Sequence, residues 1–432
     1  MCSKVLVQSV CVAACLLLNI PVCPAQTNTN NTDSLSLTIQ QAEATFLEKN
    51  LQLLARHYNV EADKALKQQA RLWDNPVLNT DQNIYSNHQF FEHGQDAAGN
   101  PTGQVFIQVQ QLIRTAGKRG KLMDMAGTNA DISQWQFNDV MRSLKQQLRV
   151  DFYTVHQLLA IQDLYNEQQQ QLEKLLAGMK AQLDAGNIAR KDMLRIEALE
   201  ISLQQDAVDN VKKLNDTEAE LRILLQITDN VFIRPITTAA LPAMPSQDIT
   251  AIIEAAKASN ATYHLQQLQL QYQQQNLSYQ KALAVPDVTV GPEYDHNSNY
   301  TPHYFGIGIN LPLPVFNRNQ GNIKSASYQL KAQESSMQQA DVVLRNNVLS
   351  AYNKLTATLQ LISGKQEDFF TNYSQLYNKV VESYQQRQLS LIEFIDYFQA
   401  YKDIRQKQLQ LELNLRQARE DLNFQVGQDL VQ

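Results

Sequence analysis

The residues best able to bind a metal ion are histidines, and four of the seven lie in two polar segments rich in asparagine and glycine. These are His88, His93, His296 and His303, with Glu92 and Asp96 close to the first pair. Imidazole and carboxylate groups can bind zinc or copper, but this spacing matches no closed zinc or copper site. Solvated loop residues are therefore the preferred interpretation, and a weak metal site is the alternative. No cofactor is expected.

Three acidic residues could act through their charge alone. Asp192 and Glu393 stand 201 positions apart in similar segments, and Asp396 follows Glu393 by three residues. Residues three apart on a helix share one face, and carboxylates gathered around an opening attract cations. The alternative is that they are solvated residues of a first helical turn, where the helix dipole favours negative charge.

The sequence offers no motif for catalysis. It contains no glycine-rich phosphate loop, no Gly-x-Ser-x-Gly and no His-Glu-x-x-His, so we do not expect an enzyme. All four cysteines lie in the first 23 residues, so no disulfide or thiol nucleophile is expected downstream. With 37 basic and 43 acidic residues and a net charge of −6, nucleic acid is a poor partner.

The start of the chain has the pattern of an export signal. Lys4 is its only charged residue, the apolar run Val10–Ile20 is too short to span a bilayer, and a small-residue cleavage site ends at Ala25. We therefore predict a signal peptide over residues 1–25. Lipidation of Cys23 is the less favoured alternative, because a bulky valine precedes it.

Glycine and proline are scarce, with 14 and 12 residues among 432, which predicts long helices. They gather near 76–127 and 286–321, so the chain has the order helix, breaker-rich stretch and long helices twice. We predict a first repeat at 26–228 with a hairpin at about 77–113, a linker at 229–247, and a second repeat at 248–432 with a hairpin at about 287–313.

Fixed spacings support the duplication. Asn50 and Asn260 lie 210 positions apart, whereas Gly120 and Gly321 lie 201 positions apart. A single insertion of nine residues in the first breaker-rich stretch accounts for the change. The two halves are therefore tandem repeats.

The proline-free stretches have helical periodicity. Val140, Leu144, Leu148 and Phe152 recur at intervals of four residues among polar neighbours. They predict a helix from about 121 to 184, which would be about 100 Å long. An ordinary antiparallel bundle or coiled coil would also fit this pattern.

The breaker-rich stretches alternate as β-strands do. The alternating apolar residues are Val105, Ile107, Val109, Phe305, Ile307 and Ile309. No run of 18 apolar residues follows the signal, so any membrane crossing would need strands. Two hairpins supply only four strands, and known bacterial barrels begin at eight, so several copies would be required. Two surface hairpins on a soluble protein are the alternative.

This plan resembles the TolC-type outer-membrane efflux channels over essentially the whole chain after the signal. The stretches Gly117-Lys118-Arg119-Gly120 and 311–321 are similar to the strand-to-helix junctions of the heavy-metal (CzcC/CusC-like) branch. The resemblance implies a mainly α fold, in which long helices form an α-helical barrel through the periplasm. Four β-strands per chain would complete a 12-stranded transmembrane β-barrel in a homotrimer.

The resemblance also implies a location and partners. The channel would lie in the outer membrane of a Gram-negative bacterium, in contact with its lipid, with most of the chain in the periplasm. Its partners would be a periplasmic adaptor and an inner-membrane RND-type pump.

Site residues follow from the same resemblance. The strand-to-helix junctions contain Gly117, Gly120, Pro312, Pro314 and Gly321. The periplasmic tips, where an adaptor would dock, contain Gly186, Asn187, Ile188, Ala189, Arg190, Arg387, Leu389 and Ser390. In a trimer, Asp192, Glu393 and Asp396 would form rings of carboxylates at the aperture. The family usually has glycine at both tips, and here the second tip has Arg387.

We therefore expect the passive exit channel of a three-part efflux pump that exports metal cations. The energy would come from the RND-type partner, because this chain has no nucleotide-binding motif. One alternative is the same channel serving multidrug efflux or type I protein secretion. Another is a soluble periplasmic coiled-coil scaffold or adaptor.

Overall fold

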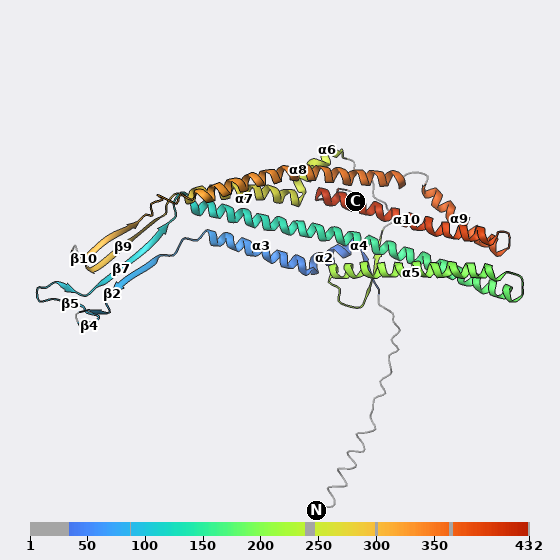
Figure 1. Cartoon of the computed structure of the whole chain (residues 1–432), viewed down its shortest axis with the longest axis horizontal. Coiled ribbons are helices and arrows are strands. Elements are labelled where there is room, and N and C mark those ends of the chain that lie inside the picture. Colours follow the sequence, from blue (N-terminus) through green and yellow to red (C-terminus); the bar gives the residue numbers. More distant parts are fainter. Residues whose placement is uncertain (1–33, 87, 238–246, 299–300, 363–365, 431–432) are drawn as a thin grey trace, which may run out of the picture.

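The computed structural model describes residues 34–86, 88–237, 247–298, 301–362 and 366–430. The predicted signal peptide and Cys23 lie outside the described residues. The molecule is elongated, with a small β-sheet at one end and the turns of two long helical hairpins at the other (Figure 1). The predicted mainly α fold with a small β part is confirmed. None of the described helices combines the length and apolarity needed to cross a membrane.

The secondary structure follows the duplicated plan. The first half contains β1 (Ser34–Thr38), α2 (Ile39–Lys49), α3 (Leu51–Ala70), β2 (Val77–Gln82), β3 (Tyr85–Ser86), β4 (Gln89–Phe90), β5 (Gly94–Gln95), β6 (Pro101–Thr102), β7 (Val105–Ile113), α4 (Lys118–Asp184), α5 (Arg190–Leu225) and β8 (Phe232–Ile236). The second half contains α6 (Ile249–Ser259), α7 (Ala261–Leu283), β9 (Val288–Asn297), β10 (Pro302–Asn310), α8 (Gln320–Ile362), α9 (Gln366–Gln385) and α10 (Leu391–Val426). The 67 residues of α4 span about 100 Å, and α8 followed by α9 is its counterpart.

One four-stranded sheet joins the two hairpins. Its order is β10-β9-β7-β2, and every neighbouring pair is antiparallel. The contact between β7 and β9 unites the halves and leaves β2 and β10 as the two edges. The stretch between β2 and β7 also contains two short ladders, β3–β4 and β5–β6. The second is closed by Asp96, whose carboxylate accepts hydrogen bonds from the backbone N–H groups of Ala98 and Asn100, both at 2.8 Å.

Asn50 and Asn260 have the same structural role in the two halves. Each ends a short helix and begins a longer one, and its side-chain oxygen accepts a backbone N–H three residues on. Each also donates its side-chain amide to a carbonyl near the end of a distant helix, Leu224 at 3.0 Å and Gln425 at 2.8 Å. The two asparagines are 210 positions apart and their two acceptors are 201 positions apart. Each contact therefore joins a residue from the part of the repeat with the first spacing to one from the part with the second spacing. The buried asparagines fasten α2–α3 to α5 and α6–α7 to α10.

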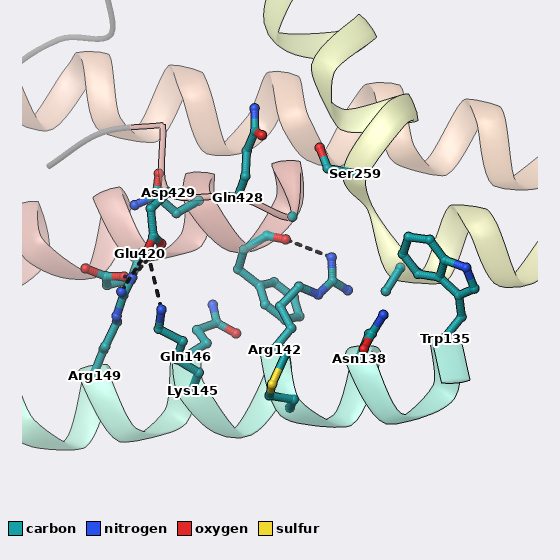
Figure 2. Close-up of a pocket in the computed structure, with 15 residues that line it drawn as sticks. Trp135, Asn138, Arg142, Lys145, Gln146, Arg149, Ser259, Glu420, Gln428 and Asp429 are labelled. Atoms are coloured by element: carbon teal, nitrogen blue, oxygen red, sulfur yellow. Dashed lines mark hydrogen bonds and ion pairs between the residues drawn. The ribbon is translucent and has the colours of Figure 1, made fainter. Parts of the chain in front are cut away.

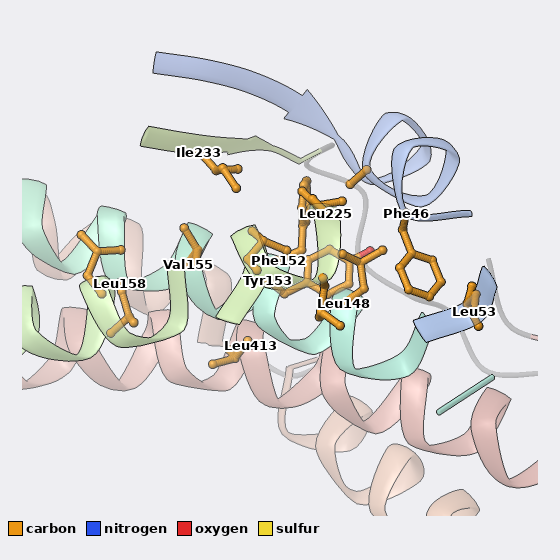
Figure 3. Packing of buried hydrophobic residues seen from close by; sticks show 14 residues of the cluster. Phe46, Leu53, Leu148, Phe152, Tyr153, Val155, Leu158, Leu225, Ile233 and Leu413 are labelled. Atoms are coloured by element: carbon orange, nitrogen blue, oxygen red, sulfur yellow. The ribbon is translucent and has the colours of Figure 1, made fainter. Parts of the chain in front are cut away.

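The core is divided along the length of the molecule. One cluster lies halfway along, where the fully buried Phe46 of α2, Phe152 of α4 and Ile233 of β8 belong to the same cluster as Leu413 of α10 (Figure 3). Another lies near the helical turns and contains residues of α4, α5, α9 and α10. The two helical hairpins are therefore packed together at the end that carries the predicted tips.

Candidate functional site

The two tips have the same backbone geometry. In the first, Gly186 N–H donates to the Leu183 carbonyl at 2.9 Å, and the next N–H reaches back five residues at 2.8 Å. In the second, Arg387 N–H donates to Tyr384 at 3.0 Å, and the next N–H again reaches back five residues at 2.8 Å. This is a helix C-terminal motif with one left-handed residue. That residue is Gly186 at φ 74° and Arg387 at φ 60°.

A cavity of about 590 Å³ lies between the tips. It brings together four of the predicted tip residues, two from each half. Its lining includes Asn187, Ile188, Arg387 and Leu389, with Lys174, Met179, Tyr384 and Phe394. Ile188 and Leu389 also pack against the core cluster near the helical turns. The tips are therefore held against each other within one chain, and the cavity opens between them.

Glu393 caps its own helix. Its carboxylate accepts hydrogen bonds from the Ser390 hydroxyl at 2.6 Å and the Ser390 backbone N–H at 3.0 Å, and its own N–H donates to the Ser390 hydroxyl at 3.3 Å. This is a capping box, which satisfies N–H groups left free at a helix start. These bonds from Ser390 hold the pKa of Glu393 below its usual range. The side chain therefore stays charged but is occupied by its own chain.

The other two acidic residues lie in different surroundings. Asp396 is exposed one turn further along α10. Asp192 is half-buried in the first turn of α5. Burial raises the pKa of Tyr384, and the negative charge of Asp192 raises it further, so Asp192 lies close to the opposite hairpin. In the described part of one chain, Asp192, Glu393 and Asp396 form no cluster able to hold a metal ion.

A buried lysine connects the sheet to the helices. Lys118 Nζ lies 2.7 Å from Asp287 Oδ1 and donates to the Val285 carbonyl at 2.6 Å. Thr115 N–H also donates to Asp287, at 2.8 Å. Gly117 precedes the lysine in a left-handed conformation at φ 67°, which lets the chain turn from β7 into α4. Lys118 and Asp287 were missed as candidates, although Lys118 stands inside the Gly-Lys-Arg-Gly stretch.

The other predicted junction residues lie close to the helix starts. Gly120 and Gly321 fall in the first turns of α4 and α8. Pro312 and Pro314 occupy the connection after β10, and the Pro314 carbonyl accepts a hydrogen bond from Arg318 Nε at 3.2 Å. In the second half, Pro312 and Pro314 come shortly after β10, and Gly321 lies inside the first turn of α8. The chain therefore changes direction between Pro314 and Gly321.

A pocket of about 390 Å³ lies halfway along the molecule, where ion pairs hold the residues that follow α10 against α4 (Figure 2). Arg149 of α4 lies 2.5 Å from Glu43, 2.7 Å from Glu420 and 2.8 Å from Asp429. Burial opposes the charge of Arg149, but these carboxylates raise its pKa on balance. Lys145 also contacts Asp429, at 3.4 Å. The residues after α10 are thus fastened to α4 by charges that satisfy one another.

The predicted histidines do not form one group. Only His296 and His303 come together, with ring centroids 4.8 Å apart. His88 Nδ1 lies 3.4 Å from the Tyr85 hydroxyl, and His93 lies in the extended first hairpin. No group of three or more histidine, cysteine or acidic side chains able to hold a metal ion occurs among the described residues.

Comparison with known proteins agrees with this arrangement. Residues 252–428 match the family model "Outer membrane efflux protein". The chain is 20% identical over 363 residues to the cobalt-zinc-cadmium resistance protein CzcC of Cupriavidus metallidurans, covering 83% of this chain and 82% of that protein. Crystal structures of CusC superpose with a TM-score of 0.72 at 15% identity, covering 90% of this chain and 92% of that one. The CmeC outer membrane channel of Campylobacter jejuni gives 0.75 at 11% identity, with 90% and 86% covered.

The curated relative and the solved structures each match more than four fifths of the chain. The family description confirms the predicted outer-membrane localisation. The structural likeness extends over both hairpins and the long helices, and it identifies the fold as that of a TolC-like channel. Residues 252–428 thus match the outer membrane efflux protein family, and the described chain has the fold of the TolC-type channels.

Proposed function

We propose that three copies of this chain form the passive exit channel of a tripartite efflux pump, and that the pump exports metal cations. The observation that carries the proposal is the two-faced sheet. Phe305, Ile307 and Ile309 of β10 project from one face, each more than 70% exposed. A wall with lipid on one side and water on the other requires such a face.

The opposite face of the sheet is polar. Gln108 donates to Glu293 at 2.7 Å, and Gln104 donates to Asp295 at 3.1 Å. A Cβ added at Gly308 would come within 2.5 Å of the Gln108 side chain, so glycine leaves room for this polar row. Glu293 and Asp295 make no ion pair with a lysine or arginine within the described residues. Such carboxylates facing a lumen would favour cations.

The two edges of the sheet are complementary. Because all four strands are antiparallel, β2 and β10 run in opposite directions. A β10 edge can therefore pair with the β2 edge of another copy and keep the sheet antiparallel. A head-to-tail contact of this kind forms a ring when the rotation between copies closes. Three copies give the twelve strands that the resemblance to TolC-type channels implies, and the outer face would contact outer-membrane lipid.

We propose the partners and the aperture from the same resemblance. The tips around the cavity would receive a periplasmic adaptor, and an inner-membrane RND-type pump would supply the energy. Asp192, Glu393 and Asp396 would contribute rings of charge at the aperture, and Glu393 would also hold the start of α10. The similarity to a cobalt-zinc-cadmium resistance protein supports metal cations as the exported class.

A susceptibility panel tests the substrate. A deletion strain should become sensitive to divalent cobalt, zinc, cadmium or copper, and the intact gene should restore resistance. Sensitivity only to dyes and detergents would instead support multidrug efflux, and a defect only in a secreted protein would support type I secretion. Native mass spectrometry in detergent should give a trimer. A water-soluble monomer would support the scaffold or adaptor alternative and contradict the channel.

A further inference from the structure

The end of the sheet farthest from the helices carries a cluster of two imidazoles and a phenol. Tyr294 and His296 lie on β9, and His303 lies on β10. The two histidine rings are 4.8 Å apart between centroids. The Tyr294 hydroxyl lies 3.0 Å from His303 Nδ1 and 3.4 Å from His296 Nδ1. Both Nδ1 atoms therefore face the same oxygen.

The strand pairing explains how the rings meet. The ladder pairs Pro302 with Asn297 and Tyr304 with Asp295, so His303 and His296 lie opposite each other between two paired positions. His303 has a left-handed backbone at φ 58°, which costs a residue other than glycine about 1–2 kcal/mol. Backbone strain of this kind persists where the surroundings hold it and often marks a functional position.

The cluster lies on the apolar face of the sheet. Tyr294 pairs with Phe305 on one side and with Ile107 on the other, and directly paired residues point to the same face. His296 follows Tyr294 by two residues, so it shares that face. The polar row of Gln108 and Glu293 points the other way. The site is therefore separate from the surface that we assign to the lumen.

We propose that His296, His303 and Tyr294 form a binding site for one divalent transition-metal ion per chain. Two neutral imidazole nitrogens are good ligands for copper, nickel and zinc, and copper(II) binds a given set of nitrogen and oxygen ligands most tightly among them. The phenol can donate to one of the two nitrogens and accept from the other in its Nδ1–H tautomer, and a metal ion would replace these hydrogen bonds by engaging both nitrogens when neither carries a proton. With two nitrogens and at most one oxygen from the protein, the remaining positions stay open to water, so the site is exchangeable.

The inference goes beyond the proposed function, because metal binding at this site does not depend on what the channel transports. Binding should be measured on the purified full-length protein in detergent, prepared without a polyhistidine tag. Titration with copper(II) should show one ion per chain. His296→Ala and His303→Ala should each weaken the affinity about tenfold or more, and acid should release the metal because imidazole must be neutral to bind.

Two further variants and a spectrum sharpen the test. His88→Ala is the matched control, since this histidine also contacts a tyrosine hydroxyl but has no histidine partner in the cluster, and it should bind copper as the wild type does. Tyr294→Phe, which removes only the oxygen, should weaken binding less than either histidine variant. Electron paramagnetic resonance of the wild type with copper(II) should show two coordinated nitrogens, whatever the variants do to folding. No binding by the wild type, one nitrogen or none, or unchanged affinity in both histidine variants would overturn the site.

Discussion

Arg387 occupies a backbone position that suits glycine, and replacing it should stabilise the second tip. The two tips have the same hydrogen bonds, yet the left-handed residue is Gly186 in one and Arg387 in the other. The first tip therefore shows how the same turn is built with glycine at the left-handed position, and it can be compared with the second tip. We predict that Arg387→Gly strengthens the turn and that Gly186→Ala weakens the equivalent one.

The magnitude follows from the backbone. A left-handed conformation costs a residue with a Cβ about 1–2 kcal/mol, and glycine gives back part of this through greater freedom in the opened chain. A net change of about 1 kcal/mol is expected at Arg387, or a factor of about five in the local opening equilibrium. A Cβ built at Gly186 meets no atom within 4 Å. The cost of Gly186→Ala is therefore conformational, with no steric contribution.

Hydrogen exchange measures these two openings directly. The amide of Gln388 donates to the Ser383 carbonyl and that of Asn187 to the Gln182 carbonyl, both at 2.8 Å. In Arg387→Gly, protection at the first amide should rise about fivefold, and in Gly186→Ala protection at the second should fall by a similar factor. Arg387→Ala keeps the Cβ and separates backbone strain from loss of the guanidinium, so it should leave protection close to the wild type. Equal protection in Arg387→Gly and Arg387→Ala would refute the argument.

Three more predictions follow from single side chains. Burial raises the pKa of Asp151 to about 6, whereas the pKa in an unfolded chain is about 3.9. The charged carboxylate therefore lowers the stability of the fold above pH 6. This loss of stability disappears as the pH falls to about 4. Asp151→Asn should therefore raise the melting temperature at pH 7.5 but not at pH 4, and an equal gain at both would contradict the assignment. Glu393→Gln with Asp396→Asn keeps the capping box but removes both charges, and should lower cation selectivity in planar bilayers; unchanged selectivity would remove these residues from the aperture. Asn50→Ala should destabilise the purified protein in urea by about 1–2 kcal/mol through the lost cap, and Asn50→Ser, which keeps the cap but not the bond to Leu224, should lose less.

The positions of helix breakers predicted the long helices and the two hairpins, and the resemblance to TolC-type channels supplied the fold in which they are combined. Proline-free stretches predicted a helix from about 121 to 184, and α4 extends from 118 to 184. The repeat offset brought Asn50 and Asn260 into correspondence, and the structure gives both the same bonds. The helix could be predicted because its ends depend on local sequence.

The site was less predictable, because its contacts are long-range. The Ser-x-x-Glu spacing at 390–393 was visible and is typical of a capping box, yet Glu393 was interpreted mainly as an aperture residue. The meeting of His296 and His303 depends on cross-strand register and on one positive φ angle, which no local pattern predicts. Likewise, Lys118 forms an ion pair with Asp287, which lies 169 positions further along the sequence. Only the pairing of β7 with β9 brings the two side chains together.

The proposed channel depends on closure of the sheet between copies, and disulfide cross-linking in outer membranes can detect that closure. Leu78 on β2 and Ile307 on β10 point to the same apolar face at opposite edges. All four native cysteines lie in the first 23 residues. A disulfide between strands can therefore form only between the introduced cysteines. Leu78→Cys combined in turn with Phe305→Cys, Ile307→Cys and Ile309→Cys scans the register between copies.

At the correct register, we expect oxidised products that end at a closed, disulfide-linked trimer. Leu78→Cys with Val290→Cys is the control, because Val290 lies on the interior strand β9, and it should remain monomeric under denaturing conditions. Monomers in every edge pair, or products that stop at a dimer, would contradict a channel built from three copies of this chain.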